Sequence, residues 1–215
     1  MPLFRRRTIW FPTLCGWLLL AGIFGGSLLL WILRGEAFLA STDRRPAEVL
    51  VVEGWIGDDG VRAAADEFKR GGYRYVVATG GATGHRWSLG HLTYTEIAEE
   101  DLLRAGIPRD QVIAAKPDDV ARERTYESAV AVRSALAAKG LHPRAINDFT
   151  LGAHARRSRL VFAKVFHGES EVGVVSWRPA EYHDDAWWHS SERAQDFLKE
   201  TVGYGFELFL NSGRW

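Results

Sequence analysis

A run of twenty uncharged and mostly apolar residues near the amino terminus sets the strongest limit on how this chain folds. Residues 14–33 read LCGWLLLAGIFGGSLLLWIL. A helix of this length crosses the roughly 30 Å hydrocarbon core of a bilayer at about 1.5 Å per residue. A cleaved signal peptide would have a shorter apolar stretch and a small-residue cleavage site, which AFLA at 37–40 matches poorly. We therefore expect a single, retained transmembrane helix at 14–33.

Basic residues around this run predict its orientation. Three arginines at 5–7 precede it, and Arg34 follows it directly. The positive-inside rule then places residues 1–13 in the cytoplasm and the rest of the chain on the other side of the membrane. Within the run, Gly22 and Gly26 have the spacing that lets two spanning helices approach closely, which suggests a homodimer through these glycines. The alternative is that glycine is simply common in such helices.

Charge and cysteine content exclude several classes of protein. Lys plus Arg and Asp plus Glu each total 27, so no net positive charge favours binding to nucleic acid. The single cysteine, Cys15, excludes an intramolecular disulfide and a cysteine-based zinc site. Residues 1–45 carry six arginines against two acidic residues, a net charge of +4, which leaves −4 for the remainder. We expect residues 34–46 to be a linker to a mildly acidic domain at 47–215.

The alternation of short β-rich runs with helical stretches from residue 47 onward predicts βαβ units and a parallel sheet. The expected strands are 48–53, 74–79, 111–115, 145–151 and 171–176, and the expected helices are 59–70, 93–105, 125–139, 153–166 and 190–210. Glycines at 71–72, 106 and 140 follow three of these helices, where a left-handed helix end would fall. The predicted fold class is α/β: a Rossmann-like, doubly wound, mainly five-stranded parallel sheet preceded by one transmembrane helix.

The last expected helix has apolar residues at helical spacing. These residues are Ala194, Phe197, Leu198, Val202 and Phe209. The favoured interpretation is that this face packs on the sheet. Trp187 and Trp188 directly precede the helix and suggest a second interpretation, in which the helix docks on the membrane surface.

In a doubly wound sheet, ligands bind outside the carboxyl ends of the strands, so the strand-to-helix turns hold the candidate site. At the fourth turn, His154, Arg156 and Arg157 occupy the start of a helix, where the helix dipole favours anions. Cations are unfavourable there unless an anion lies among them, so we interpret this turn as a phosphate or carboxylate site. We expect Arg157→Ala to abolish ligand binding and to leave the fold intact. The alternative is that the arginines face water or pair with Glu127 or Asp118.

Two further turns add candidate ligand-binding residues. Gly80 and Gly81 follow the second strand and can bring backbone N–H groups close to a ligand. The segment matches neither a dinucleotide-binding nor a Walker motif, so a plain loop is the alternative. After the third strand, Thr125 can cap its helix, with Glu127 favourably placed in the first turn.

Glu53 ends the first strand and is a candidate catalytic residue. It would act as a general base if burial raised its pKa, or it would bind Arg157 across the crevice. No G-x-S-x-G or H-E-x-x-H motif is present. The histidine and aspartates at 183–185 lie in a loop with Trp187 and Trp188, which favours packing, so we expect no metal site.

Four segments carry a family resemblance that covers roughly residues 49–166. They are VLVVEGW at 49–55, TGG at 79–81, the helix DLLRAGIPRDQVI, and the pair ERTYESA and HARRSR. Together they resemble the YdcF/SanA/ElyC family of bacterial envelope-associated proteins. On this match, Thr125 and Glu127 align with the family's threonine and glutamate, and His154 and Arg157 align with its histidine and arginine.

The resemblance implies a Rossmann-like domain anchored in the bacterial inner membrane and linked to peptidoglycan or lipid-carrier metabolism. We expect an extracytoplasmic domain that binds a phosphorylated envelope precursor or a nucleotide-type ligand. The expected ligand-binding residues are Gly80, Gly81, Thr125, Glu127, Arg156 and Arg157. In any phosphoester hydrolysis or transfer, His154 or Glu53 would be the acid or base. The alternative is a non-catalytic envelope-integrity factor that acts through protein partners. One relative is associated with S-adenosylmethionine, but the sequence assigns no cofactor.

Overall fold

A computed structural model describes residues 10–83, 92–118, 123–182 and 186–210 of the chain. The chain divides into two compact units, residues 1–35 and 36–215. Most of the first unit is helix α1 (Leu14–Leu39), which is the one helix in the described part that is long and apolar enough to cross a membrane. This supports the predicted membrane-spanning helix, which continues for six residues beyond the expected end at residue 33.

Five parallel strands form the sheet of the second unit, and they confirm the predicted α/β fold class. They are β1 (Val49–Glu53), β2 (Tyr75–Thr79), β3 (Val112–Ala115), β4 (Ala145–Leu151) and β5 (Glu171–Trp177). Their order is β3-β2-β1-β4-β5. All five residues of β1 are buried, as expected for a central parallel strand that is covered on both faces. The strand order reverses between β1 and β4, which places the ligand crevice of such a fold at their carboxyl ends.

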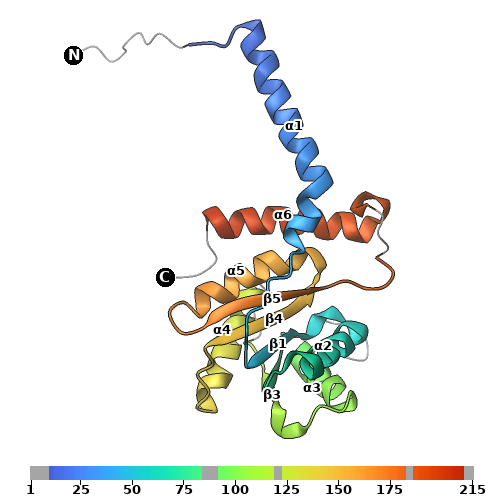
Figure 1. Ribbon diagram of the computed structural model, residues 1–215, viewed down its shortest axis with the longest axis vertical. Coiled ribbons are helices and arrows are strands. Elements are labelled where there is room, and N and C mark those ends of the chain that lie inside the picture. The colour runs from blue at the N-terminus through green and yellow to red at the C-terminus, as the bar shows by residue number, and fades with distance from the viewer. Residues whose placement is uncertain (1–9, 84–91, 119–122, 183–185, 211–215) are drawn as a thin grey trace, which may run out of the picture. The chain divides into compact units, whose positions relative to one another are not determined.

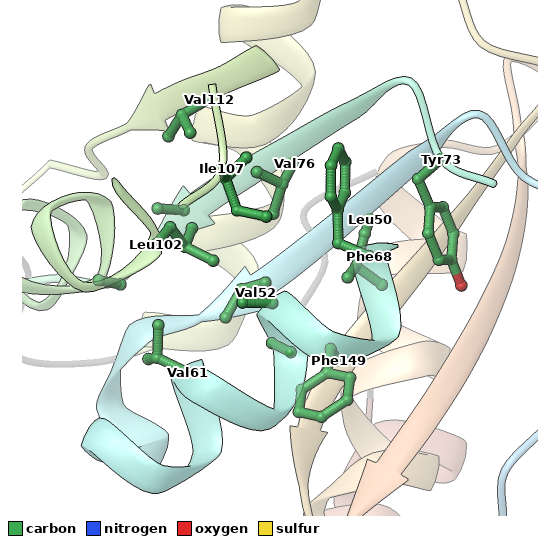
Figure 2. Close-up of a cluster of buried hydrophobic side chains, with 14 of the residues drawn as sticks. Leu50, Val52, Val61, Phe68, Tyr73, Val76, Leu102, Ile107, Val112 and Phe149 are labelled. Atoms are coloured by element: carbon green, nitrogen blue, oxygen red, sulfur yellow. The ribbon is translucent and has the colours of Figure 1, made fainter. Parts of the chain in front are cut away.

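Helices cover both faces of the sheet (Figure 1). Helices α2 (Asp58–Gly71) and α3 (Tyr94–Arg104) lie on one face, and α4 (Arg124–Ala138) and α5 (Ala155–Val165) lie on the other. Successive strand residues point to opposite faces, so β1 contributes Leu50 and Val52 to the first core and Val49 and Val51 to the second. Figure 2 shows side chains of α2 gathered against Leu50 and Val52 in the first of these cores.

Local sequence signals explain four of the helix ends. Gly72, Gly106 and Gly140 follow α2, α3 and α4, and their φ angles of 71°, 86° and 66° confirm the predicted left-handed helix ends. At the start of α3, Thr93 forms a capping box with Glu96, in which each side chain binds the other residue's backbone N–H.

Residues 36–46, which we expected to belong to a linker, are part of the folded domain. Asp43 and Val174 form an antiparallel bridge with N–O distances of 2.8 and 2.9 Å. Arg44 binds both carboxylate oxygens of Glu67. The backbone of Arg45 exchanges two hydrogen bonds with the buried side chain of Asn147. The domain therefore begins near residue 36 rather than at residue 47.

The last helix, α6 (Ser191–Phe209), packs against α5 and the short 3-10 helix Gly152–His154, and Figure 1 shows it running beside α5. Phe197 is buried, but Leu198, Val202 and Phe209 are exposed. The prediction that these apolar residues pack on the sheet is therefore wrong for three of them. The reason is that α6 buries charged residues, each of which finds an oppositely charged partner in the domain.

Candidate functional site

A cavity of about 590 Å³ lies at the carboxyl ends of β1, β2 and β4. This volume falls in the range of small-molecule binding sites. Its walls come from the ends of these strands, the glycine turn after β2, the first turn of α4, the start of α5 and helix α6. The lining residues are Glu53, Trp55, Gly80, Gly81, Ala82, Tyr94, Glu123, Arg124, Thr125, Tyr126, Ser128, His154, Arg157, Lys199 and Glu207.

The cavity brings together six of the eight predicted site residues: Glu53, Gly80, Gly81, Thr125, His154 and Arg157. The other two, Arg156 and Glu127, do not line it. Arg156 donates to the carbonyl of Phe38 at 2.7 Å and stacks on that ring, with its guanidinium carbon 3.8 Å from the ring centre. Arg156 therefore binds Phe38 at the end of α1. It does not face the cavity as a ligand-binding residue, which was the prediction.

Glu53 forms the floor of the cavity, and its carboxylate is fully engaged. Ser158 donates to Oε1 at 2.9 Å, while Trp55 Nε1 at 3.1 Å and the Thr150 hydroxyl donate to Oε2. Burial raises the pKa of Glu53, but the charge of His154 and the hydrogen bonds from Thr150 and Ser158 outweigh this effect, and the net pKa is lowered. The condition for a general base, a raised pKa, is therefore not met. Glu53 orients its neighbours instead.

His154 lies between two buried carboxylates. Its Nδ1 is 3.1 Å from Glu200 Oε1, and its Nε2 is 3.3 Å from Glu53 Oε2. The second contact is an ion pair rather than an aligned hydrogen bond. Burial lowers the pKa of His154, but the charges of Glu53 and Glu200 outweigh it and raise the pKa to about 9. His154 is therefore a protonated, positively charged ring at neutral pH.

Arg157 is bound to Glu200 in a two-pronged ion pair. Its Nε is 2.6 Å from Oε2 and its Nη2 is 3.0 Å from Oε1 of that carboxylate. Burial on its own raises the pKa of Glu200, but the charges of His154 and Arg157 more than reverse this effect and lower the pKa well below its usual range.

 Arg157 therefore pairs with Glu200 rather than with Glu127 or Asp118, and its side chain is mostly buried rather than open to water. Its positive charge is largely neutralised inside the protein.

A second buried acid, Asp148, lies on β4 on the same face of the sheet as Glu53. Neither of its carboxylate oxygens has a hydrogen-bond partner among the described residues. Burial and the nearby charge of Glu53 raise the pKa of Asp148 well above its usual value. Asp148 is therefore the neutral member of this carboxyl pair.

The first turn of α4 opens onto the cavity without a side-chain cap. The N-cap residue is Glu123, in a left-handed conformation with φ of 57°, and its side chain makes no capping hydrogen bond. The prediction that Thr125 caps this helix is therefore wrong, because Thr125 lies inside the first turn. This turn lines the cavity, so its partial positive charge lies beside the exposed side chain of Arg124, and no side chain of the described residues is seen to cap it.

Packing requires glycine at only one of the two glycine positions after β2. A Cβ on Gly80 would lie 2.6 Å from the Cβ of Tyr94, and the residue has a φ of 150°, so the close approach of α3 requires glycine there. A Cβ on Gly81 would lie 3.9 Å from Pro117, an ordinary contact. Packing alone thus accounts for Gly80, and only Gly81 is left without a structural reason.

Sequence reasoning missed the contributions of Trp55 and of α6 to this site. Arg193, Glu200 and Glu207 of α6 are all buried, and they recur every seven residues, about two helical turns. Their partners are Glu36, Arg157 and Lys164. The seven-residue spacing of charges is visible in the sequence, but its partners lie at distant positions along the chain.

Within the part of the chain that the structure describes, no group of three or more His, Cys, Asp or Glu residues is arranged to hold a metal ion. The candidate residues 183–185 lie outside the described ranges. A scan against protein-family models finds no match, and searches of curated proteins and of solved structures find none either.

Proposed function

We propose that this chain is a membrane-anchored protein whose α/β domain binds a phosphorylated ligand, such as a lipid-linked phosphate or a nucleotide, in the cavity at the carboxyl ends of β1, β2 and β4. The observation that carries the proposal is the first turn of α4, which lines this cavity and has no side-chain cap among the described residues. Phosphate groups bind well at such a turn, because the free N–H groups and the helix dipole both favour an anion.

The charges around the cavity support this choice of ligand. Arg124 is exposed, and no described residue forms an ion pair with it. Lys199 is 63% exposed on its side chain and lies 3.6 Å from Glu200, a loose contact. These two cations are available to a ligand, whereas His154 and Arg157 are held by Glu200 and shape the floor. The proposed anion site is therefore the first helical turn of α4, and not the connection between β4 and α5 that the sequence analysis favoured.

The cellular setting belongs to the same proposal. The apolar helix α1 supports a membrane anchor. The arginines at 5–7 favour an extracytoplasmic domain, and the resemblance to the YdcF/SanA/ElyC family suggests the bacterial inner membrane and cell-envelope metabolism. A phosphorylated envelope precursor is the ligand class that fits this setting.

The test is a thermal-unfolding screen of the full-length protein in detergent. The ligands are inorganic pyrophosphate, a polyprenyl phosphate, a sugar nucleotide and S-adenosylmethionine. At a hundredfold excess over Kd, a ligand stabilises the folded state by about 2.7 kcal/mol, which corresponds to roughly 5–11 °C in Tm for a domain of this size. We expect such a shift with at least one phosphorylated ligand.

Two arginine variants provide the control. Arg124→Ala should remove the shift, because it deletes an exposed cation at the cavity. Arg62→Ala should keep it, because Arg62 is exposed on α2 and pairs only with Asp59 among the described residues. Arg157→Ala is unsuitable, since it would leave Glu200 without its main ion pair. The absence of a shift with every ligand would contradict the proposal.

One observation favours a second candidate function, a non-catalytic envelope factor that acts through protein partners. His154 and Arg157 are engaged in internal ion pairs rather than held open for a ligand. The same screen separates the two functions, because a partner-binding factor predicts no shift with any of the small ligands.

A further inference from the structure

We propose that the outer face of α6, formed by Leu198, Val202, Phe206, Phe209 and Leu210, lies in the interface of the bilayer that residues 14–33 cross. This inference concerns a lipid surface and does not depend on what the cavity binds. It rests on three features of the domain: the apolar outer face, the charged inner face, and the short link to the spanning segment.

The outer face of α6 is apolar and open. Leu198, Val202 and Phe209 are 57%, 73% and 85% exposed, and Phe206 and Leu210 are exposed as well. Steps of four, four and three residues from Leu198 to Phe209 place these side chains on one side of the helix. A continuous exposed apolar stripe of this kind marks an interaction surface.

The inner face of the same helix is charged. Arg193, Glu200 and Glu207 are buried there, and each forms an ion pair with a residue of the domain at 2.6–2.8 Å. A helix on the water-exposed surface of a globular protein has the opposite arrangement, with its apolar stripe inward. In α6 the apolar residues face outward and the charged residues face inward. This arrangement suits a helix whose outer side contacts lipid.

A short stretch of chain connects α6 to the membrane span. Glu36 forms a two-pronged ion pair with Arg193, and the ring of Phe38 packs edge-on against Tyr204 at 5.8 Å. Glu36 comes three residues after Leu33, the last residue of the apolar run, which is about 4.5 Å along a helix. Helix α6 is therefore bound to Glu36 and Phe38, which follow the apolar run within five residues of the chain.

This link selects lipid over a second copy of the chain as the occupant. Residues 36 and 38, which contact α6, follow the apolar run within five residues in every molecule, whereas a second copy has to be encountered by diffusion.

The experiment measures the depth of labels in the full-length protein. A Cys15→Ser background removes the native thiol. Single cysteines are then introduced by Val202→Cys or Phe209→Cys, spin-labelled, and reconstituted in phosphatidylethanolamine–phosphatidylglycerol vesicles. We expect both labels to be several-fold more accessible to oxygen, which concentrates in lipid, than to a water-soluble nickel chelate. Both side chains are exposed, so these substitutions leave the core untouched.

Two control positions fix the scale. A label at Phe24→Cys, in the apolar run, reports lipid, and a label at Arg62→Cys, on the exposed surface of α2, reports water. Labels on α6 that behave like the one at Arg62 would overturn the proposal. So would spin–spin broadening at Val202 that disappears on dilution with unlabelled protein, since that result would show a second copy on this face.

Discussion

His154 is a buried cation whose charge depends on its neighbours. Its ring would lose its proton in a neutral interior, because burial disfavours the charged form. The carboxylates of Glu53 and Glu200 reverse this and raise the pKa to about 9. The ring is therefore a fixed positive charge in the wall of the cavity at physiological pH.

The raised pKa of His154 predicts a dependence of stability on pH. The folded state binds this proton more tightly than the unfolded chain, whose histidine has a pKa of about 6.5. The stabilisation is therefore complete below pH 6.5 or so and is lost as the pH rises to about 9. We expect the free energy of unfolding to fall by about 3 kcal/mol over this range, measured by denaturant titration at several pH values.

A second group with the same sign needs a control. Asp148 has a raised pKa, so it also makes the folded state less stable as the pH rises. The variant Asp148→Asn removes this contribution and keeps the ion pairs of His154. The fall in stability between about pH 6.5 and 9 should persist in this variant. A flat profile there would show that His154 is not held as a cation.

At the scale of the elements, α3 approaches the end of β2 so closely that it restricts residue 80. Gly80→Ala places a Cβ within 2.6 Å of Tyr94 in a backbone conformation that L residues rarely adopt. We expect a loss of roughly 1–3 kcal/mol in the free energy of unfolding. Thermal unfolding of the variant checks this value.

Gly81→Ala is the matched control for this substitution. Its added methyl group meets Pro117 at an ordinary distance of 3.9 Å, so stability should be almost unchanged. Equal effects of the two substitutions would argue against the close contact between α3 and Gly80.

The sequence predicts the helices and strands of the domain well. The bounds of β4 agree with the prediction, and the other expected strands differ by a residue at one end. The continuous apolar strands and the glycine helix ends carry this information locally. The carboxyl-end rule for parallel sheets also places Glu53, Gly80 and His154 around one cavity, as expected.

The orientation of α6 could not be predicted in the same way. Its apolar residues were assigned to the core because such residues are usually buried in soluble domains. The structure buries Arg193, Glu200 and Glu207 instead. Each of these residues needs a partner on another element, and a single sequence does not show which charges meet across the fold.

At the scale of the whole molecule, the segment 36–46 follows the apolar run and completes the domain. A fragment of residues 47–215 would lose the Asp43–Val174 bridge and would leave Asn147 and Arg193 without their main partners. We expect it to be less stable than a 36–215 fragment by roughly 3 kcal/mol or more, measured by thermal unfolding in detergent. Equal Tm values would mean that the segment contributes nothing to the fold.

The charged inner face of α6 also sets an order of events during folding. Six of its nineteen residues are charged, so the helix cannot enter the bilayer as a second span. Its three inner charges are neutralised only when Glu36, Arg157 and Lys164 have been brought into position by the folded domain. The apolar outer face of α6 therefore takes its place only after the sheet and α5 have folded.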